Sequence, residues 1–198
     1  MEIMKYTDFI TQQLTESAQV KEELIRHCLP EIEQCGVLCA DVLKNGGKLL
    51  LCGNGGSAAD AQHIAAELVV RLSAQLNRNA LPVIALTVNT SILTACANDF
   101  GFDTIFSRQV EAYGQQGDVL IGISTSGKSL NVYQALELAK SRKLHTIGFL
   151  GVDGGTIKDI VDIALIVPHT DTARIQEAHI TVGHIICHII EQELFVKK

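Results

Sequence analysis

Five short stretches of the chain are almost entirely hydrophobic, and segments of mixed character separate them. The stretches are residues 48–52, 82–87, 119–124, 145–150 and 163–167. Their apolar residues run continuously instead of alternating with polar ones, which is typical of strands buried on both faces of a parallel sheet. Helices are expected between and after them, over residues 57–72, 90–98, 104–113, 129–142 and 172–194. This alternation predicts an α/β fold, a three-layer sandwich with a five-stranded parallel sheet flanked by helices.

The segment before the first strand, residues 5–44, is expected to form two helices. Its apolar residues at helical spacing are Leu24, Cys28, Ile32, Cys35, Leu38, Cys39, Val42 and Leu43, and Pro30 falls between the two helices. An Asn-Gly-Gly sequence at 45–47 then ends the second helix, because glycine readily takes the backbone conformation of a helix C-cap. No linker or repeat interrupts the rest. We therefore expect a single domain over residues 1–198, with the helical pair in 1–46 and the α/β core in 47–198.

Composition and charge exclude several classes of protein. The net charge is −6, and no cluster of Lys and Arg suited to a nucleic-acid backbone is present. No apolar run approaches the length that spans a bilayer, and the first residues lack the apolar core of a signal peptide, so we expect a cytoplasmic protein. The six cysteines form no CxxC pair and lie in apolar or helical settings, which predicts buried, reduced thiols.

Two loops rich in glycine and hydroxyl groups follow the first and third predicted strands. Residues 53–57 read Gly-Asn-Gly-Gly-Ser and open directly into a helix, and residues 124–129 read Ser-Thr-Ser-Gly-Lys-Ser. Glycines let the backbone approach an anion, and a helix N-terminus offers unpaired N–H groups and a positive dipole. Ligands of parallel sheets bind at the carboxyl ends of the strands. The loops therefore predict one phosphorylated small molecule held between them.

A dinucleotide is the competing ligand for the first loop. Residues 53–58 satisfy G-x-G-x-x-A, a loose form of the nucleotide-binding fingerprint. A nicotinamide-binding unit also carries an acidic residue at the end of the second strand, where it holds the ribose. Here that strand ends in Leu-Thr-Val-Asn at 86–89, without a carboxylate, and the spacing is long. The sequence disfavours a dinucleotide.

The helix after the first loop carries His63 and Glu67, which lie four residues apart and share a face. This spacing fits a solvated pair on the surface. It also fits a catalytic base with its orienting partner, or two ligands of a zinc ion that keeps an open position for chemistry. The sequence alone leaves these alternatives open.

The last predicted helix is apolar on most positions yet contains Gln176 and His184, spaced by two turns. A buried polar residue must find a partner or serve a function. His179 and His188 fit satisfied core or interface histidines, whereas His184 is functional if it faces the histidine and glutamate of the earlier helix.

Other polar residues have a local and a functional interpretation. The pair Asn98 and Asp99 is either a helix-ending turn or a set of partners for sugar hydroxyls. Arg108 and Arg174 could neutralise a phosphate or pair with nearby acids. Asp171 has the position of a helix N-cap.

Five motifs stand out when the chain is considered as a whole. They are Cys-Gly-Asn-Gly-Gly-Ser at 52–57, Ala-Gln-His-x-Ala-x-Glu at 61–67, Asn-Asp-Phe-Gly-Phe at 98–102, Gly-Ile-Ser-Thr-Ser-Gly-x-Ser at 122–129 and Arg-Ile-Gln-Glu-x-His at 174–179. In this order they resemble the bacterial sedoheptulose 7-phosphate isomerases (phosphoheptose isomerases), a family of the sugar isomerase (SIS) fold group. The match runs from about residue 47 to 194.

This resemblance implies a strand order like that of flavodoxin and a set of site residues at matching positions. The implied catalytic pair is Glu67 and His184. The implied substrate-binding residues are Asn54, Gly55, Gly56, Ser57, Glu67, Asn98, Asp99, Ser124, Thr125, Ser126, Ser129 and Gln176. The implied ligands of one zinc ion per subunit are His63, Glu67, Gln176 and His184. The family also implies a homotetramer with sites at subunit contacts, to which the helices of 1–46 contribute.

The implied reaction converts D-sedoheptulose 7-phosphate to D-glycero-D-manno-heptose 7-phosphate through an enediol, the first step of ADP- and GDP-heptose biosynthesis. Glu67 would move the proton between carbons and His184 between oxygens. One alternative is a non-catalytic SIS-domain protein of the replication initiator-associating type, which differs where this chain has these two residues. Another is a sugar-phosphate sensor. One departure from the pattern is Ala173, where some isomerases carry Asp.

Overall fold

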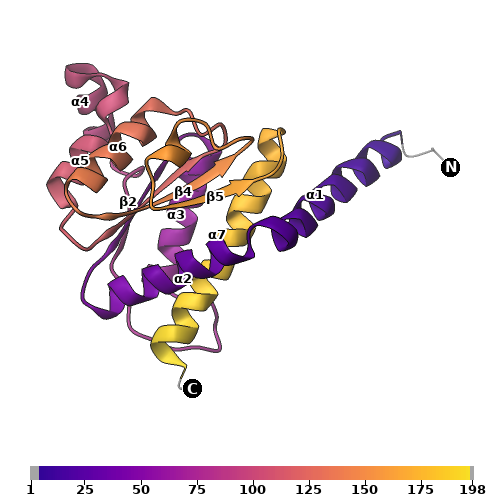
Figure 1. The fold of residues 1–198 in the computed structure, drawn as a ribbon, viewed down its shortest axis with the longest axis horizontal. Helices are drawn as coiled ribbons and strands as arrows, with labels where there is room; N and C mark the ends of the chain where they lie inside the picture. Colours follow the sequence, from indigo (N-terminus) through magenta and orange to yellow (C-terminus); the bar gives the residue numbers. More distant parts are fainter. Residues whose placement is uncertain (1–4, 197–198) are drawn as a thin grey trace.

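The computed structural model describes residues 5–196, and its centre is a five-stranded sheet with helices on both faces (Figure 1). The strands are β1 (Leu49–Gly53), β2 (Val83–Ala85), β3 (Val119–Ser124), β4 (His145–Gly151) and β5 (Ile163–Val167). All neighbouring strands are parallel, in the order β2-β1-β3-β4-β5. This is the flavodoxin-like order, so the predicted three-layer α/β fold is confirmed.

Seven helices of the described chain surround the sheet. They are α1 (Thr7–His27), α2 (Leu29–Lys44), α3 (Gly56–Val69), α4 (Thr90–Phe100), α5 (Ser107–Tyr113), α6 (Leu130–Ser141) and α7 (Thr172–Phe195), with short 3₁₀ turns η1 (Phe102–Thr104) and η2 (Ile157–Asp159). The helix predicted over 104–113 begins later than expected. Gly101 takes a positive φ of 94° that ends α4, and the next three residues form η1 before α5 can start.

Side chains of each strand alternate between two hydrophobic cores. Leu49 and Leu51 face the core shared with α1, α2, α3 and α7, whereas Leu50 and Cys52 face the core shared with α5 and α6. Every residue of β1 and β3 is buried, as the continuous apolar runs predict. The edge strand β2 is shorter than its predicted run, and it buries Val83 and Ala85 on one face of the sheet while Ile84, on the other face, is exposed.

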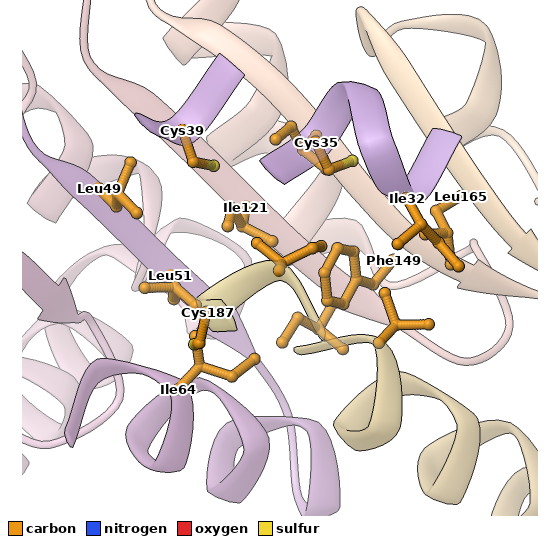
Figure 2. Close-up of a cluster of buried hydrophobic side chains, with 14 of the residues drawn as sticks. Ile32, Cys35, Cys39, Leu49, Leu51, Ile64, Ile121, Phe149, Leu165 and Cys187 are labelled. Carbon is orange, nitrogen blue, oxygen red and sulfur yellow. The ribbon is translucent and has the colours of Figure 1, made fainter. Parts of the chain in front are cut away.

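The cysteines behave as the sequence predicts. All six are free and buried. Cys35 and Cys39 of α2 and Cys187 of α7 lie in the first core together with Leu49 and Leu51 (Figure 2). Burial raises the pKa of Cys35 to about 12, so its thiol stays protonated near neutral pH and packs as a small apolar group.

The N-terminal pair is two helices joined at Cys28, with Pro30 in the first turn of α2, where its missing N–H has no helical partner to lose. Only part of α1 packs on the body, and its N-terminal half projects beyond the sheet (Figure 1). Phe9, Ile10 and Leu14 of this half are exposed. Among residues 5–196, no helix has the length and apolar character needed to cross a membrane.

Candidate active site

The two glycine- and hydroxyl-rich loops lie next to each other. Strands β1 and β3 are neighbours, with Gly53 aligned to Ile123, so the loops that follow them leave the sheet at the same edge. Strand β2 lies on the other side of β1, which makes this edge the switch point of the fold. Helices α3 and α6, which begin at these loops, start without a side-chain cap. Their first N–H groups are therefore suited to an anion, as predicted.

The first loop is shaped by glycine. Gly55 has φ 54°, a conformation that glycine takes without strain. A Cβ on Gly56 would lie 2.5 Å from Nε2 of Gln176, so the side chain of Gln176 from α7 rests directly on this loop. Ser57 is buried in the first turn of α3. The structure thus places Gln176, which the family resemblance implies as a substrate-binding residue and a zinc ligand, against the first loop.

An amide pair that the sequence did not predict joins the two loops. Nδ2 of Asn54 donates to Oδ1 of Asn131 at 2.9 Å, and Nδ2 of Asn131 donates back to Oδ1 of Asn54 at 2.9 Å. Asn131 is buried in the first turn of α6, where its Oδ1 also accepts from the N–H of Val132. No motif marks Asn131, because its partner lies 77 residues away in the chain. The Asn54 side chain therefore fixes the spacing of the two loops.

The second loop carries its hydroxyl groups on a backbone held by a neighbouring turn. Oγ of Ser124 and Oγ of Ser129 are 2.9 Å apart, and Oγ of Ser126 accepts from the N–H of Lys128 at 3.2 Å. A Cβ on Gly127 would lie 2.1 Å from the carbonyl oxygen of Gly154. Only glycine allows this approach of two backbones, so the turn after β4 supports the loop from behind.

The groups predicted on α3 and α7 converge. Nε2 of His63 lies 2.8 Å from Nε2 of His184 and 3.3 Å from Oε1 of Glu67. The two imidazole rings meet edge to face, with centroids 5.0 Å apart. Residues 63 and 184 are 121 positions apart in the sequence, so their meeting is a property of the fold. His63 and Glu67 are therefore more than a solvated pair on the surface of one helix, because the His184 ring from α7 lies at the same place.

This cluster fits a metal ion. One ligand atom from each of His63, Glu67 and His184 lies within 4.8 Å of the others. Two neutral imidazole nitrogens and one carboxylate oxygen are the ligand set of many catalytic zinc sites, in which the fourth position stays open. Gln176 lies two turns before His184 on α7. The donor set therefore agrees with zinc, although other divalent metals accept the same ligands.

Asp60 is a neighbour of this cluster that the sequence analysis missed. Burial raises its pKa to about 6, although nearby His63 acts in the opposite direction. Its Oδ2 is buried and has no hydrogen-bond partner among residues 5–196. The signal was present in the sequence, because positions 60, 63 and 67 follow one face of a helix. A carboxyl group that titrates near neutrality thus lies beside the cluster.

Asn98 and Asp99 are exposed near the end of α4, and Nδ2 of Asn98 donates to Oδ1 of Asp99 at 2.8 Å. In Figure 1, α4 lies at an outer corner of the molecule, away from α7. Within one chain, Asn98 and Asp99 therefore fit the local interpretation, in which they belong to a turn that ends a helix. Arg108 likewise pairs with its neighbour Glu111 at 2.8 Å.

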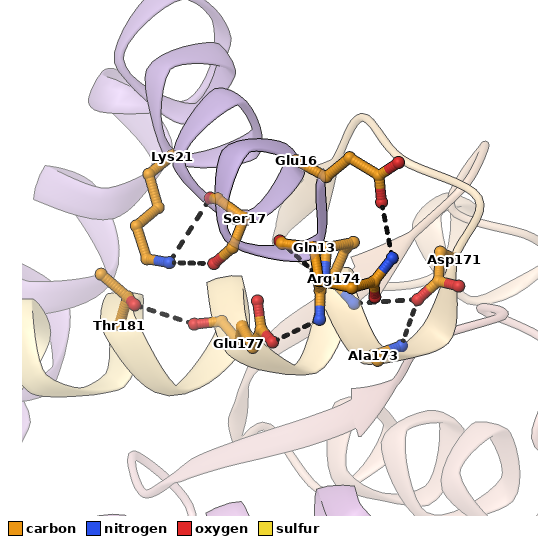
Figure 3. A network of polar contacts seen from close by, with 9 residues as sticks. All are labelled: Gln13, Glu16, Ser17, Lys21, Asp171, Ala173, Arg174, Glu177 and Thr181. Carbon is orange, nitrogen blue, oxygen red and sulfur yellow. Dashed lines mark hydrogen bonds and ion pairs between the residues drawn. The ribbon is translucent and has the colours of Figure 1, made fainter. Parts of the chain in front are cut away.

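Arg174 also has a local role. Its Nη1 donates to the carbonyl of Gln13 at 2.6 Å and its Nη2 to Glu177 at 2.6 Å, so it fastens α1 to α7 (Figure 3). Asp171 caps α7 through the N–H groups of Ala173 and Arg174, as predicted (Figure 3). Ala173 itself is exposed in the first turn of α7.

The remaining histidines of α7 differ from each other. His179 is a core histidine, as one interpretation predicted: it is buried, and its Nε2 lies 3.0 Å from the carbonyl oxygen of Leu150. It is satisfied at one nitrogen only, because its Nδ1 is buried without a partner among residues 5–196. His188 is exposed on the other side of the helix.

Comparison with known proteins defines the class. The family model described as the SIS domain matches residues 12–151. This chain is therefore an SIS-domain protein, in agreement with its strand order and with the loops at its switch point.

More similar relatives define the particular family. The phosphoheptose isomerase of Geobacter sulfurreducens is 57% identical over 188 residues, covering 95% of this chain and 98% of the relative. The structure of the Neisseria gonorrhoeae phosphoheptose isomerase is 44% identical, with a TM-score of 0.89, and covers 95% of this chain and 100% of its own. That from Francisella tularensis is 38% identical, with a TM-score of 0.90, at 96% and 100% coverage. The chain belongs to the phosphoheptose isomerase family, and nothing in the comparisons supports the non-catalytic alternatives.

Proposed function

We propose that this chain converts D-sedoheptulose 7-phosphate to D-glycero-D-manno-heptose 7-phosphate at the site built by α3, α7 and the two loops. The convergence of His63, Glu67 and His184, two to three turns along the helix that begins at the first loop, is the observation that carries the proposal. A sensor or a docking protein needs the loops but has no use for a base and a proton shuttle. The product would enter the biosynthesis of ADP- or GDP-heptose for lipopolysaccharide or related surface glycans.

Glu67 and His184 divide the proton transfers. The Glu67 carboxylate removes a proton from C1 of the ketose and delivers it to C2, and its side chain, 20% exposed, is accessible to a substrate. His184 carries the proton between the two sugar oxygens as the enediol forms and collapses. His63 holds His184 in place, because their Nε2 atoms lie 2.8 Å apart.

The phosphate lies at the two loops. The N–H groups at the start of α3 and α6 lie at this edge of the sheet, and so do Ser124, Ser126 and Ser129 at the end of β3 and in the loop that follows it. Thr125 and Ser57 complete the predicted set. Asn98 and Asp99 bind the sugar from a neighbouring subunit, since within one chain they lie away from α7.

His63, Glu67 and His184, with Gln176 as a fourth ligand, would hold a zinc ion. Bound there, zinc would polarise the sugar carbonyl and stabilise negative charge on its oxygen. A carboxylate bound tightly to a metal is a poor base. For this reason we propose that Glu67 coordinates the ion only weakly.

The active form is a homotetramer. The exposed apolar residues Phe9, Ile10 and Leu14 of α1 and an apolar groove between α2 and α7, lined by Val37 and Ile185 among others, support subunit contacts there. Leu14→Glu should shift the sedimentation coefficient to that of a smaller species, whereas Thr15→Glu, exposed on a different side of the helix, should not. The unpaired cysteines agree with a reducing compartment, and we place the protein in the cytoplasm.

Turnover of sedoheptulose 7-phosphate by purified protein in D₂O tests the function. We expect heptose 7-phosphate with deuterium at C2, because the proton held by Glu67 exchanges with solvent. Absence of product would refute the isomerase. Deuterium at C2 would exclude a direct hydride shift, which carries hydrogen from C1 to C2 without exchange. The same assay after exhaustive chelation, with zinc then added back, tests the metal. Full activity in demetallated protein would exclude zinc as an essential component.

A further inference from the structure

The connection from α3 to β2, residues 70–82, contains a buried charge that the proposed mechanism does not use. The connection forms no helix or strand, yet the side chain of Arg78 in its middle is fully buried (0% exposed). In Figure 1 the connection passes beside the C-terminal end of α7. A guanidinium is removed from water only at a large free-energy penalty, so its partners are informative.

The first partners of Arg78 are backbone groups at the end of α3. Its Nη2 donates to the carbonyl oxygen of Glu67 at 2.8 Å, and its Nη1 donates to that of Leu68 at 2.8 Å. The last carbonyls of a helix have no partner within the helix and carry the negative end of its dipole. Arg78 therefore closes α3 and fixes the backbone of Glu67, the proposed base.

The second partner of Arg78 is on α7. Its Nε donates to Oε1 of Glu191 at 2.8 Å, and the Glu191 side chain is 4% exposed. Glu191 lies seven residues after His184, two turns further along the same helix. The guanidinium also lies over the ring of Phe195, with its carbon 5.8 Å from the centroid. One side chain thus ties the end of α3 to α7.

From this geometry we propose that Arg78, together with Glu191, is a positioning residue for the isomerase reaction. Arg78 holds the backbone of Glu67 and, through Glu191, the helix that carries His184. It therefore sets the separation of the base and the proton shuttle without touching the substrate. This inference rests on the roles given to Glu67 and His184 in the proposed function.

Arginine suits this task better than other residues. Its planar guanidinium donates in fixed, diverging directions, here to two carbonyls of α3 and one carboxylate of α7 at once. A lysine would keep the charge but could not hold all these partners in the same geometry. A buried ion pair adds little net stability compared with apolar packing, so stability alone does not explain this one.

The test compares Arg78→Lys and Glu191→Gln with Lys48→Met. Lys48 also forms an ion pair with a buried partner, with Nζ 2.6 Å from Oδ2 of Asp118, but this pair joins the starts of β1 and β3 and involves neither α3 nor α7. All three variants should melt at a lower temperature. With kcat expressed per folded molecule, we expect Arg78→Lys to lose about 10²-fold in kcat with KM within twofold, because a small misplacement of reacting groups has an effect of this size. Glu191→Gln should lose less, and Lys48→Met should keep its kcat.

Amide hydrogen exchange provides a second measurement. In Arg78→Lys, exchange should accelerate in the last turn of α3 and not at the start of α6. A kcat per folded molecule equal to that of the wild type in both Arg78→Lys and Glu191→Gln would overturn the proposal, and so would a loss shared by Lys48→Met. Glu67→Gln, assayed in parallel, separates the two hypotheses. An active Glu67→Gln refutes the proposed function, whereas an inactive one with a fully active Arg78→Lys refutes only the positioning role.

Discussion

The two edges of the sheet differ in how their polar groups are satisfied. At the edge where the strands begin, Asp118 is 2% exposed and accepts from the Lys48 ammonium, from the backbone N–H of Lys48 and from that of Gln115. At the edge where the strands end, α3 and α6 start uncapped. Two to three turns along α3 from this edge, the polar atoms of two histidines and a glutamate lie within 4.8 Å of one another.

This difference separates groups that hold the fold from groups that are available to a ligand. A buried charge whose partners all come from its own chain contributes to folding, and its loss leaves those partners unpaired. Other groups have an anion, a metal or a sugar hydroxyl as their natural partner. Replacing such a group should change the stability of the protein little but should lower its activity. The comparison predicts that substitutions around Asp118 change stability, and that substitutions in the loops and in the cluster of His63, Glu67 and His184 change activity.

Glu67→Gln should give the largest effect of the substitutions considered, and this effect should be on activity and not on stability. The amide keeps the size of the side chain but cannot accept a proton, so kcat should fall by about 10²–10⁴-fold. The melting temperature should change little, because the side chain is 20% exposed and its pairing is with the functional cluster. Steady-state kinetics and thermal unfolding measure the two quantities. Near-wild-type kcat would remove Glu67 as the base.

Asp118→Ala should give the opposite result. It leaves the Lys48 ammonium and two backbone N–H groups without their acceptor, so the free energy of unfolding should drop by about 3 kcal/mol. The kcat of the folded protein should stay within twofold. Glu111→Ala, which breaks an ion pair whose side chains are 51% and 52% exposed, is the control and should shift stability by less than about 1 kcal/mol. Urea titration followed by circular dichroism measures both, and equal stability of the two variants would contradict the assignment.

The sequence predicted this contrast only in part. Both loops and the five strands follow from local signals, namely continuous apolar runs, glycines and hydroxyl groups close together in the chain, whereas the strand order came from the family resemblance. The spacing of His63 and Glu67 was also visible. The approach of His184 to His63, 121 positions away, was implied only by the family resemblance. The Asn54–Asn131 and Arg78–Glu191 pairs were not predicted, because they join residues 77 and 113 positions apart. Such contacts depend on how α3, α6 and α7 pack, which no local pattern encodes.

His179 and His184 lie five residues apart on the same helix but have different roles. His179 is part of the core and contributes to folding. Burial lowers its pKa to about 4, while its bond to the Leu150 carbonyl acts in the opposite direction. An unfolded histidine titrates near 6.5, so the folded state favours the neutral ring. The buried ring therefore contributes up to about 3 kcal/mol to the free energy of unfolding. This contribution is complete above about pH 6.5 and is lost as the pH falls through about 4.

His179→Gln should therefore flatten the dependence of unfolding free energy on pH between about 6.5 and 4. His27→Gln, at the exposed end of α1, should leave that dependence as in the wild type. Urea titrations at several pH values make the comparison. If the two variants have the same pH dependence, the buried ring of His179 is not the group that titrates.

Ser126→Ala should give the smallest effect and tests whether the second loop holds the phosphate. Ser126 is exposed at the open edge, and within the chain its Oγ accepts only a long bond of 3.2 Å from the Lys128 N–H among the described contacts. Loss of one hydrogen bond to the substrate should raise KM by about 3- to 10-fold and leave kcat within twofold, since one such bond contributes about 1 kcal/mol. Ser141→Ala, at the far end of α6, removes a hydroxyl bonded to the Leu138 carbonyl and should leave KM unchanged. A KM that rises equally in both variants would point to a general effect on α6, whereas an unchanged KM in Ser126→Ala would place the phosphate elsewhere along the strand ends.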